Sequence, residues 1–169
     1  HLAQDLKRFF NTDKLMEKFQ EYRSKAQEKI KIADHMLTMT YPLVRDSKLL
    51  LAVVENIFLS LSNSISSVLH YERVFKRIPP FHDTFESKFN MFKARVVPRY
   101  KISSNYIKLI TELKDIIIMH KKSPVEFSRK DMFIIASDTY NLKKISVPQI
   151  KEYIAMSKSF ISEMEEIVS

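Results

Sequence analysis

The stretch Leu49–Leu69, LLLAVVENIFLSLSNSISSVL, decides how this chain folds. It is 21 residues long with one charged side chain, Glu55, so its length and apolar character would allow it to cross a membrane. Its polar residues, however, recur at i, i+4, i+7 and i+11 and form a stripe on one helical face: Asn56, Ser60, Asn63 and Ser67. Lipid would leave these groups without partners, whereas the central helix of a soluble bundle can direct them at a neighbour or a cleft. We therefore expect a central bundle helix from about residue 46 to 76.

The polar stripe itself has two interpretations. In the first, a polar groove that holds a ligand or a partner is lined by Glu55, Asn56, Ser60, Asn63 and Ser67. In the second, the same side chains are satisfied inside the bundle by their neighbours, as buried polar groups usually are. Both interpretations place the stripe on the central helix.

A long amphipathic helix is predicted before the central one. Asn11 or Thr12 can cap it, and apolar residues follow every three or four positions from Leu15 to Leu37. We expect a short turn of helix at residues 6–10 to precede it and Pro42 to stop it. The pair at positions 79–80 is also proline and ends the central helix, so the two helices should form an antiparallel hairpin.

Three further helices are predicted from their caps. Asp83 with Glu86 resembles a capping box and starts a third helix that runs up to Pro98. Ser103 or Ser104 starts a fourth, which ends near residue 124. Ser146 with Gln149, followed by a proline in the first turn, starts the last.

Short strands interrupt the helical pattern between the last two helices. Val125–Arg129 alternates and Met132–Ala136 is a β-prone run, which predicts a hairpin whose left-handed residue is Asp131 or Lys130. Asn141 offers a second turn before a possible third strand at 142–145. The expected fold is therefore mainly α, a five-helix antiparallel bundle with a short β-hairpin inserted at about residues 125–145, in a single domain covering 1–169.

The chain has no glycine and no cysteine, and this excludes much of catalytic chemistry. Phosphate-cradling loops, dinucleotide turns and nucleophile elbows need glycine where the backbone turns sharply or approaches a ligand. Thiolate catalysis and cysteine zinc sites are excluded as well, and none of the five histidines has a second histidine at metal-ligand spacing. We expect no cofactor, no metal and no integral membrane span. With no visible signal peptide we expect a cytoplasmic protein, and since the first residue is His1 rather than methionine the native chain can extend beyond it.

The net charge of +8 is unevenly distributed. A first basic region between residues 71 and 101 comprises Arg73, Lys76, Arg77, Lys88, Lys93, Arg95, Arg99 and Lys101. A second basic region around the hairpin includes Lys121, Lys122, Arg129 and Lys130. If the two meet in space, they form a surface that attracts nucleic acid or an acidic protein partner. The alternative is a solvated, lysine-rich surface without a partner.

The order of these elements resembles the HEPN superfamily of small helical bundles over about residues 14–168. That superfamily includes metal-independent ribonucleases, toxin–antitoxin components and inactive binding versions. Its signature is an arginine, a polar residue and then a histidine, and Arg77-Ile78-Pro79-Pro80-Phe81-His82 has the arginine–histidine separation without the polar second residue. The resemblance implies that Arg77 and His82 would assist attack of a 2′-hydroxyl on its phosphate. A local stretch, MHKKSPVEFSR at 119–129 and onward to residue 150, is similar to an uncharacterised archaeal family, which implies no activity.

Two functions follow as hypotheses. The first is a non-enzymatic helical interaction module, expected to be a homodimer, whose basic face binds nucleic acid or an acidic partner. The second is a HEPN-like metal-independent ribonuclease or toxin–antitoxin component, in which a dimer brings Arg77 and His82 of two chains to one phosphate.

Overall fold

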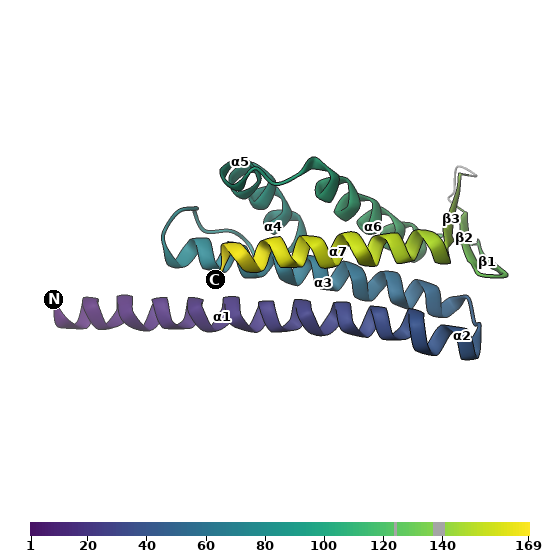
Figure 1. The fold of residues 1–169 in the computed structure, drawn as a ribbon. Helices are drawn as coiled ribbons and strands as arrows, with labels where there is room; N and C mark the ends of the chain where they lie inside the picture. The colour runs from purple at the N-terminus through teal and green to yellow at the C-terminus, as the bar shows by residue number, and fades with distance from the viewer. Residues whose placement is uncertain (124, 137–140) are drawn as a thin grey trace.

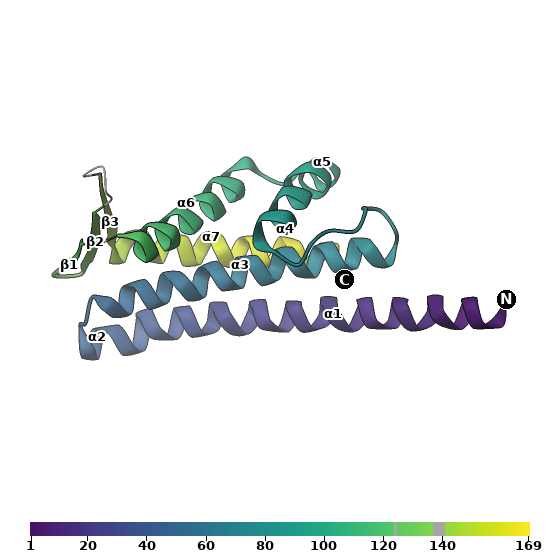
Figure 2. The same ribbon diagram turned by 180° about the vertical axis from the view of Figure 1, so that it is seen from behind.

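Two long antiparallel helices form the base of the molecule (Figures 1 and 2). The computed structural model describes residues 1–123, 125–136 and 141–169. Helix α1 (Leu2–His35) and helix α3 (Lys48–Val74) run side by side and make the predicted hairpin. Helices α4 (Phe85–Met91), α6 (Ser104–Lys122) and α7 (Val147–Ile167) pack on the opposite side of α3. The mainly α bundle is thus confirmed.

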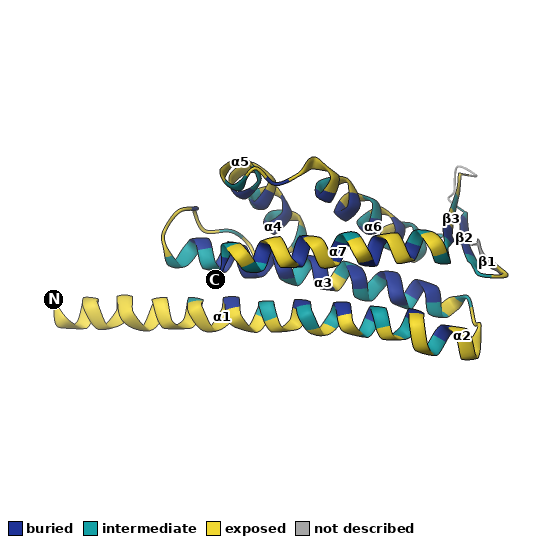
Figure 3. Cartoon of the chain, viewed as in Figure 1, coloured by how far each residue is buried: buried dark blue, intermediate teal, exposed yellow. Residues whose placement is uncertain are grey.

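Helix α3 is the centre of the core. Its apolar side chains contact both layers, and Val53, Ile57 and Leu61 have no exposed surface (Figure 3). Within the described residues α3 alone is long and apolar enough to cross a membrane, a test that the core helix of a soluble protein also passes. Here 56% of its most apolar window is buried within the protein itself.

Helix α1 is longer than its predicted cap allowed. It starts at Leu2 and continues through Asn11 and Thr12, so the proposed cap and the separate turn at 6–10 were wrong. The Thr12 hydroxyl donates to the carbonyl of Arg8 (2.9 Å), the bond of a threonine inside a helix and not at its start. The first turns of α1 project beyond the end of α3 and are exposed (Figures 1 and 3).

Pro42 and Pro98, which were predicted to stop helices, lie inside them, whereas Pro79 and Pro80 follow the end of α3. Helix α1 continues through a π-helical turn, η1 (Met36–Thr40), into α2 (Tyr41–Val44), with Pro42 near the start of α2. In the same way α4 continues through η2 (Phe92–Val96) into α5 (Val97–Tyr100), with Pro98 near its start. The residue before each proline bonds five positions back, and this widened turn accommodates a ring that would clash in a regular α-helix. With each such helix counted as continuous, the described residues contain the expected five.

Left-handed residues end several of these elements. The described positive-φ residues are Arg45 (φ 51°), Lys76 (φ 53°), Lys101 (φ 53°) and Asp131 (φ 56°). In most proteins glycine takes such positions because it has no Cβ, and here charged side chains do so. Of the two residues predicted for the left-handed position of the hairpin turn, Asp131 or Lys130, Asp131 holds it.

Among the caps predicted for the last three helices, one differs from the structure. Thr84, and not Asp83, caps α4 and accepts a bond from the Ser87 amide (3.2 Å). Asp83 instead pairs with Lys88 at 2.7 Å. Ser103 caps α6 and Ser146 caps α7, as expected, and each accepts a backbone N–H bond.

A small sheet closes the end of the bundle at the α1–α3 connection. Strands β1 (Val125–Arg129), β2 (Met132–Ala136) and β3 (Leu142–Ser146) are antiparallel in that order, so the hairpin is present and gains a third strand. The Tyr41 hydroxyl donates to Asp131 Oδ1 (2.6 Å), which ties the turn between β1 and β2 to α2. The predicted second turn falls largely on residues 137–140, outside the described residues, and Asn141 directly precedes β3.

Replacing Phe92 by alanine should destabilise the protein strongly. Phe92 has no exposed surface and packs edge-on against Phe160, with ring centroids 5.9 Å apart. Removing a buried phenylalanine ring costs about 3–5 kcal/mol of unfolding free energy, which urea unfolding measures. Phe9→Ala is the matched control, because Phe9 is 64% exposed and its loss should change stability by at most about 0.5 kcal/mol. Equal losses in the two variants would contradict the arrangement of the core.

Candidate functional site

The two basic regions lie at opposite ends of α6. The first surrounds the end of α3, the loop that follows it and the helix formed by α4, η2 and α5, whereas the second lies where α6 ends and β1 turns into β2 (Figure 1). Helix α6 has 19 residues, which at the α-helical rise separates its ends by about 28 Å. The two regions therefore do not merge into one surface within a single protomer.

Within the first region the cations divide into engaged and free groups. Arg73 donates to the Ile78 carbonyl (2.9 Å), and Arg77 and Lys88 each lie within 4.0 Å of a carboxylate. The remaining five are exposed, and none forms a salt bridge with a carboxylate in the described part of the chain: Lys76, Lys93, Arg95, Arg99 and Lys101. We call these five residues the basic end. In the second region Lys121, Lys122, Arg129 and Lys130 are exposed as well.

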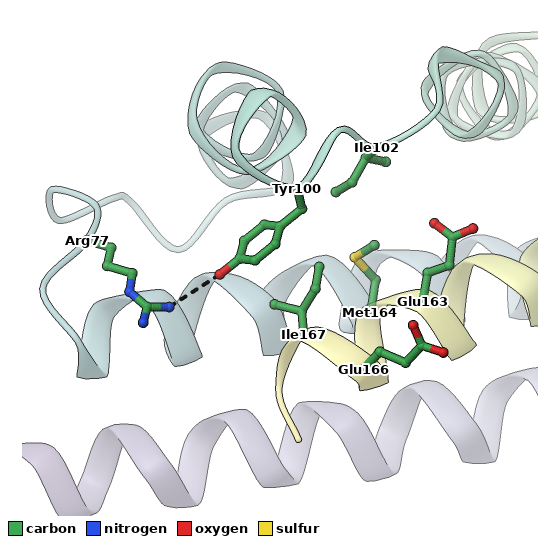
Figure 4. A pocket seen from close by; sticks show the side chains of 7 residues that line it. All are labelled: Arg77, Tyr100, Ile102, Glu163, Met164, Glu166 and Ile167. Atoms are coloured by element: carbon green, nitrogen blue, oxygen red, sulfur yellow. Dashed lines mark hydrogen bonds between the residues drawn. The ribbon is translucent and has the colours of Figure 1, made fainter.

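Arg77 lines a cavity (Figure 4) and also lies beside the buried carboxylate of Glu72. Glu72 has no exposed surface, and its Oε1 accepts a hydrogen bond from the Tyr100 hydroxyl. The Arg77 guanidinium lies 3.6 Å from Glu72 Oε2, donates to the Tyr100 hydroxyl (3.3 Å) and lies 4.8 Å from the centroid of the Phe75 ring. Burial raises the pKa of Tyr100, and its bond to Glu72 adds to that shift. These contacts join the end of α3 to the end of α5.

The surroundings of Arg77 are acidic. Its cavity, of about 740 Å³, is also lined by Glu163 and Glu166 of α7, which Figure 4 shows on the side away from the guanidinium. With Glu72 beside Arg77, the region around this cavity holds three carboxylates and one cation, an arrangement that repels phosphate. Arg77 is thus held as a structural tether between α3 and α5.

His82 is not placed beside Arg77. Its side chain is exposed in the loop before α4, and its backbone N–H donates to Ser87 Oγ (2.9 Å). No hydrogen bond or ion pair joins His82 to Arg77, and His82 is not among the residues that line the Arg77 cavity. The catalytic pair stays a prediction that would need a second chain to complete it.

The polar stripe of α3 makes its hydrogen bonds within the protein. Asn56, Ser60 and Asn63 donate to carbonyls of their own helix at 2.6–2.9 Å. Ser67 donates to the Phe19 carbonyl of α1 (2.9 Å), and Glu55 lies 4.0 Å from His120. The cavity that Ser67 lines holds about 10 Å³, at most one water molecule. Along this part of the stripe the second interpretation, internal satisfaction, describes the contacts.

A second pocket is lined by residues that the sequence analysis did not place together. It has a volume of about 210 Å³ and is lined by Lys18 and Tyr22 of α1, His70 and Arg73 of α3, and the loop residues Phe81 and Asp83, with Leu15 and Pro80. We call it the His70 pocket. The ring of His70 stacks on Tyr22 (5.1 Å between centroids) and meets Phe81 edge-on (5.3 Å). Its α1 residues are far in sequence from those at the end of α3 and in the loop that follows, so only the packing of α1 on α3 brings them together.

His70 itself is an unusual histidine. It is 8% exposed, and its Nδ1 is buried with no hydrogen-bond partner among the described residues. Burial, reinforced by the Lys88 and Lys18 ammonium groups, lowers its pKa from 6.5 to about 4. The imidazole is therefore neutral at pH 7. In the described ranges, no three His, Asp or Glu side chains gather as a metal site would require.

His70 should make the protein less stable as the pH falls. Because its pKa is lower in the folded chain, protonation favours unfolding, so this contribution is complete above about pH 6.5 and is lost progressively toward pH 4. Urea unfolding of the wild type between pH 7.5 and 4 should show this loss. His70→Phe and His70→Gln should both lose stability less steeply over the same range, and an unchanged pH dependence in both variants would contradict the assignment.

No protein-family model matches the chain, no curated protein matches its sequence and no solved structure matches its fold. The likeness to the HEPN superfamily therefore stays a prediction, and function has to be inferred from the charges, burial and contacts described above.

Proposed function

We propose that this chain is a non-enzymatic helical module that binds nucleic acid through the basic end. One observation carries the proposal: five exposed cations follow the end of α3 or lie along and after η2 and α5, and none forms a salt bridge with a described carboxylate: Lys76, Lys93, Arg95, Arg99 and Lys101. Such a group of free cations attracts the phosphate backbone of DNA or RNA, and binding releases the counterions condensed on the nucleic acid.

Cations elsewhere in the protein show the contrast. Lys25 pairs with Glu21, Lys143 with Glu112 and Lys158 with Asp34, each within 3.0 Å. These pairs neutralise their own part of the surface. At the basic end the buried carboxylate of Glu72 is already shared by Arg77 and Tyr100, and Glu86, whose charge also acts on Lys93, is paired with Lys114.

The relative orientation of the two joined helices also supports a binding surface. The contact of Arg77 and Glu72 with Tyr100 fixes the end of α5 against the end of α3, so Lys76 and Lys101, the left-handed residues after each helix, are held by a packed framework. Cations held in this way lose less conformational freedom on binding than cations on a loose loop.

The salt dependence of binding tests this function. The wild type should bind single-stranded RNA or DNA, with log K falling linearly against log salt. The triple variant K93Q/R95Q/R99Q should bind more weakly and show a slope smaller by about 2, because each lost phosphate contact removes about 0.7 from the slope for a single strand. Fluorescence anisotropy from 50 mM to 300 mM salt, roughly the range over which such contacts are lost, measures both values.

The second basic region provides a control with the same change in charge. K121Q/K122Q/R129Q removes three exposed cations about one α6 length away and should leave most of the binding intact. Equal losses in the two triple variants, or no binding by the wild type at the lowest salt, would overturn the proposal. Light scattering on the same samples determines whether the binding species is the predicted homodimer.

The ribonuclease alternative gives a different result in a cleavage assay. A non-enzymatic module leaves labelled RNA intact in the presence of a chelator, and His82→Ala changes nothing. Chelator-resistant cleavage that His82→Ala abolishes, with the circular-dichroism melting curve unchanged, would establish the alternative and exclude a purely binding role.

A further inference from the structure

The His70 pocket carries more positive charge than its single carboxylate can balance. Lys18 and Arg73 line it, and Lys88 lies next to it with its ammonium 4.8 Å from the centroid of the Tyr22 ring. Asp83 is the only acidic residue in the lining. Lys18 forms no salt bridge within the described residues, and the carboxylates of Asp83 and Glu21 act on its charge only from beyond contact distance.

The one carboxylate is poorly placed to compensate a buried cation. The Lys88 side chain is 9% exposed, whereas the Asp83 side chain that pairs with it is 85% exposed. A buried charge is costly unless its partners share its desolvated surroundings. An additional anion beside Lys18, Arg73 and Lys88 would therefore lower the electrostatic energy of the folded protein.

His70 supplies a second, independent sign of a ligand. Its side chain is more than nine-tenths buried, it lines the pocket, and its Nδ1 has no partner among the described residues. Buried polar atoms in folded proteins are nearly always hydrogen-bonded, so an atom without a partner calls for one. The pocket thus combines cationic donors from α1 and α3 with a buried nitrogen that lacks a partner.

We propose that the His70 pocket binds a phosphate group, with Lys18, Arg73 and His70 as its contacts and Lys88 as the buried charge behind them. This site is separate from the basic end and does not depend on the function proposed for it.

Size and packing favour a phosphate group over a larger or aromatic ligand. The volume of about 210 Å³ is below the range of drug-sized sites, about 300–1,000 Å³, and suits a small anion or one group of a larger molecule. The Tyr22 ring already stacks with His70 and lies under Lys88, so it forms a wall and not a platform for a nucleobase. Donors from two helices suit an anion with several oxygens.

Inorganic phosphate is the probe for the test. Added to the wild-type chain at constant ionic strength, phosphate should give a saturable heat in isothermal titration and raise Tm, whereas acetate and chloride should do neither. The ring signals of His70 should shift in NMR spectra over the same concentration range. The proposal would be overturned if chloride or acetate gave the same saturable heat and the same rise in Tm as phosphate. It would also be overturned if phosphate gave no saturable signal.

Two variants and a matched control assign the signal to the pocket. Lys18→Gln should weaken phosphate binding about tenfold, the size expected for losing one charge-assisted contact. His70→Phe should weaken it as well. Lys25→Gln is the control, because Lys25 lies on the same helix, also near the Tyr22 ring (5.7 Å), but is paired with Glu21 and does not line the pocket. Lys18 is exposed, so the Lys18→Gln variant should fold even if His70→Phe does not. Equal losses of phosphate affinity in Lys18→Gln and Lys25→Gln would contradict the site.

Two sources of the phosphate group are distinguished by a further comparison. If an RNA with a 5′-phosphate binds more tightly than the same RNA with a 5′-hydroxyl, and Lys18→Gln removes this difference, the pocket binds the end of a nucleic acid. If the two RNAs bind equally, the pocket binds free phosphate. The K93Q/R95Q/R99Q variant should keep its affinity for inorganic phosphate. The experiments therefore distinguish a basic end that does not bind nucleic acid from a His70 pocket that does not bind phosphate.

Discussion

The enclosure of α3 is the constraint on which the rest of the structure depends. A helix with so few charges needs protein on nearly every side, and α1 alone covers only one face of it. Helices α4, α6 and α7 supply the remaining cover, and the return of the chain to α3 through α4, η2 and α5 places the basic end beside the end of α3 (Figure 1). The positions of both proposed binding surfaces are thus consequences of burying one helix.

Apolar spacing was sufficient to predict the helices but not where they end. Ile57 and Leu61, four residues apart, are both fully buried, as a helical period requires. Pro42 and Pro98 were misread because the rule that proline stops a helix assumes regular α-helical bonding, and a single π-helical turn removes the clash. Asp131 could be predicted because few residues other than glycine tolerate its turn conformation.

The sequence alone predicted only part of the proposed binding surfaces. Clustering in the sequence identified the cations of the basic end, but it could not show that Lys88 is buried or that Arg77 is held by Glu72 and Tyr100, since those partners lie elsewhere in the chain. The His70 pocket needed the pairing of particular turns of α1 and α3. An antiparallel hairpin was expected, yet apolar periodicity does not determine which turns face each other.

The four left-handed residues have a consequence for the unfolded chain. Arg45, Lys76, Lys101 and Asp131 hold a backbone conformation that costs a residue with a Cβ about 1 kcal/mol or more, a strain that glycine would avoid. A chain without any glycine, however, has fewer disordered conformations to give up when it folds, and this entropic saving offsets the local strain. Inserting glycine at these turns would relax the native backbone and at the same time loosen the denatured ensemble.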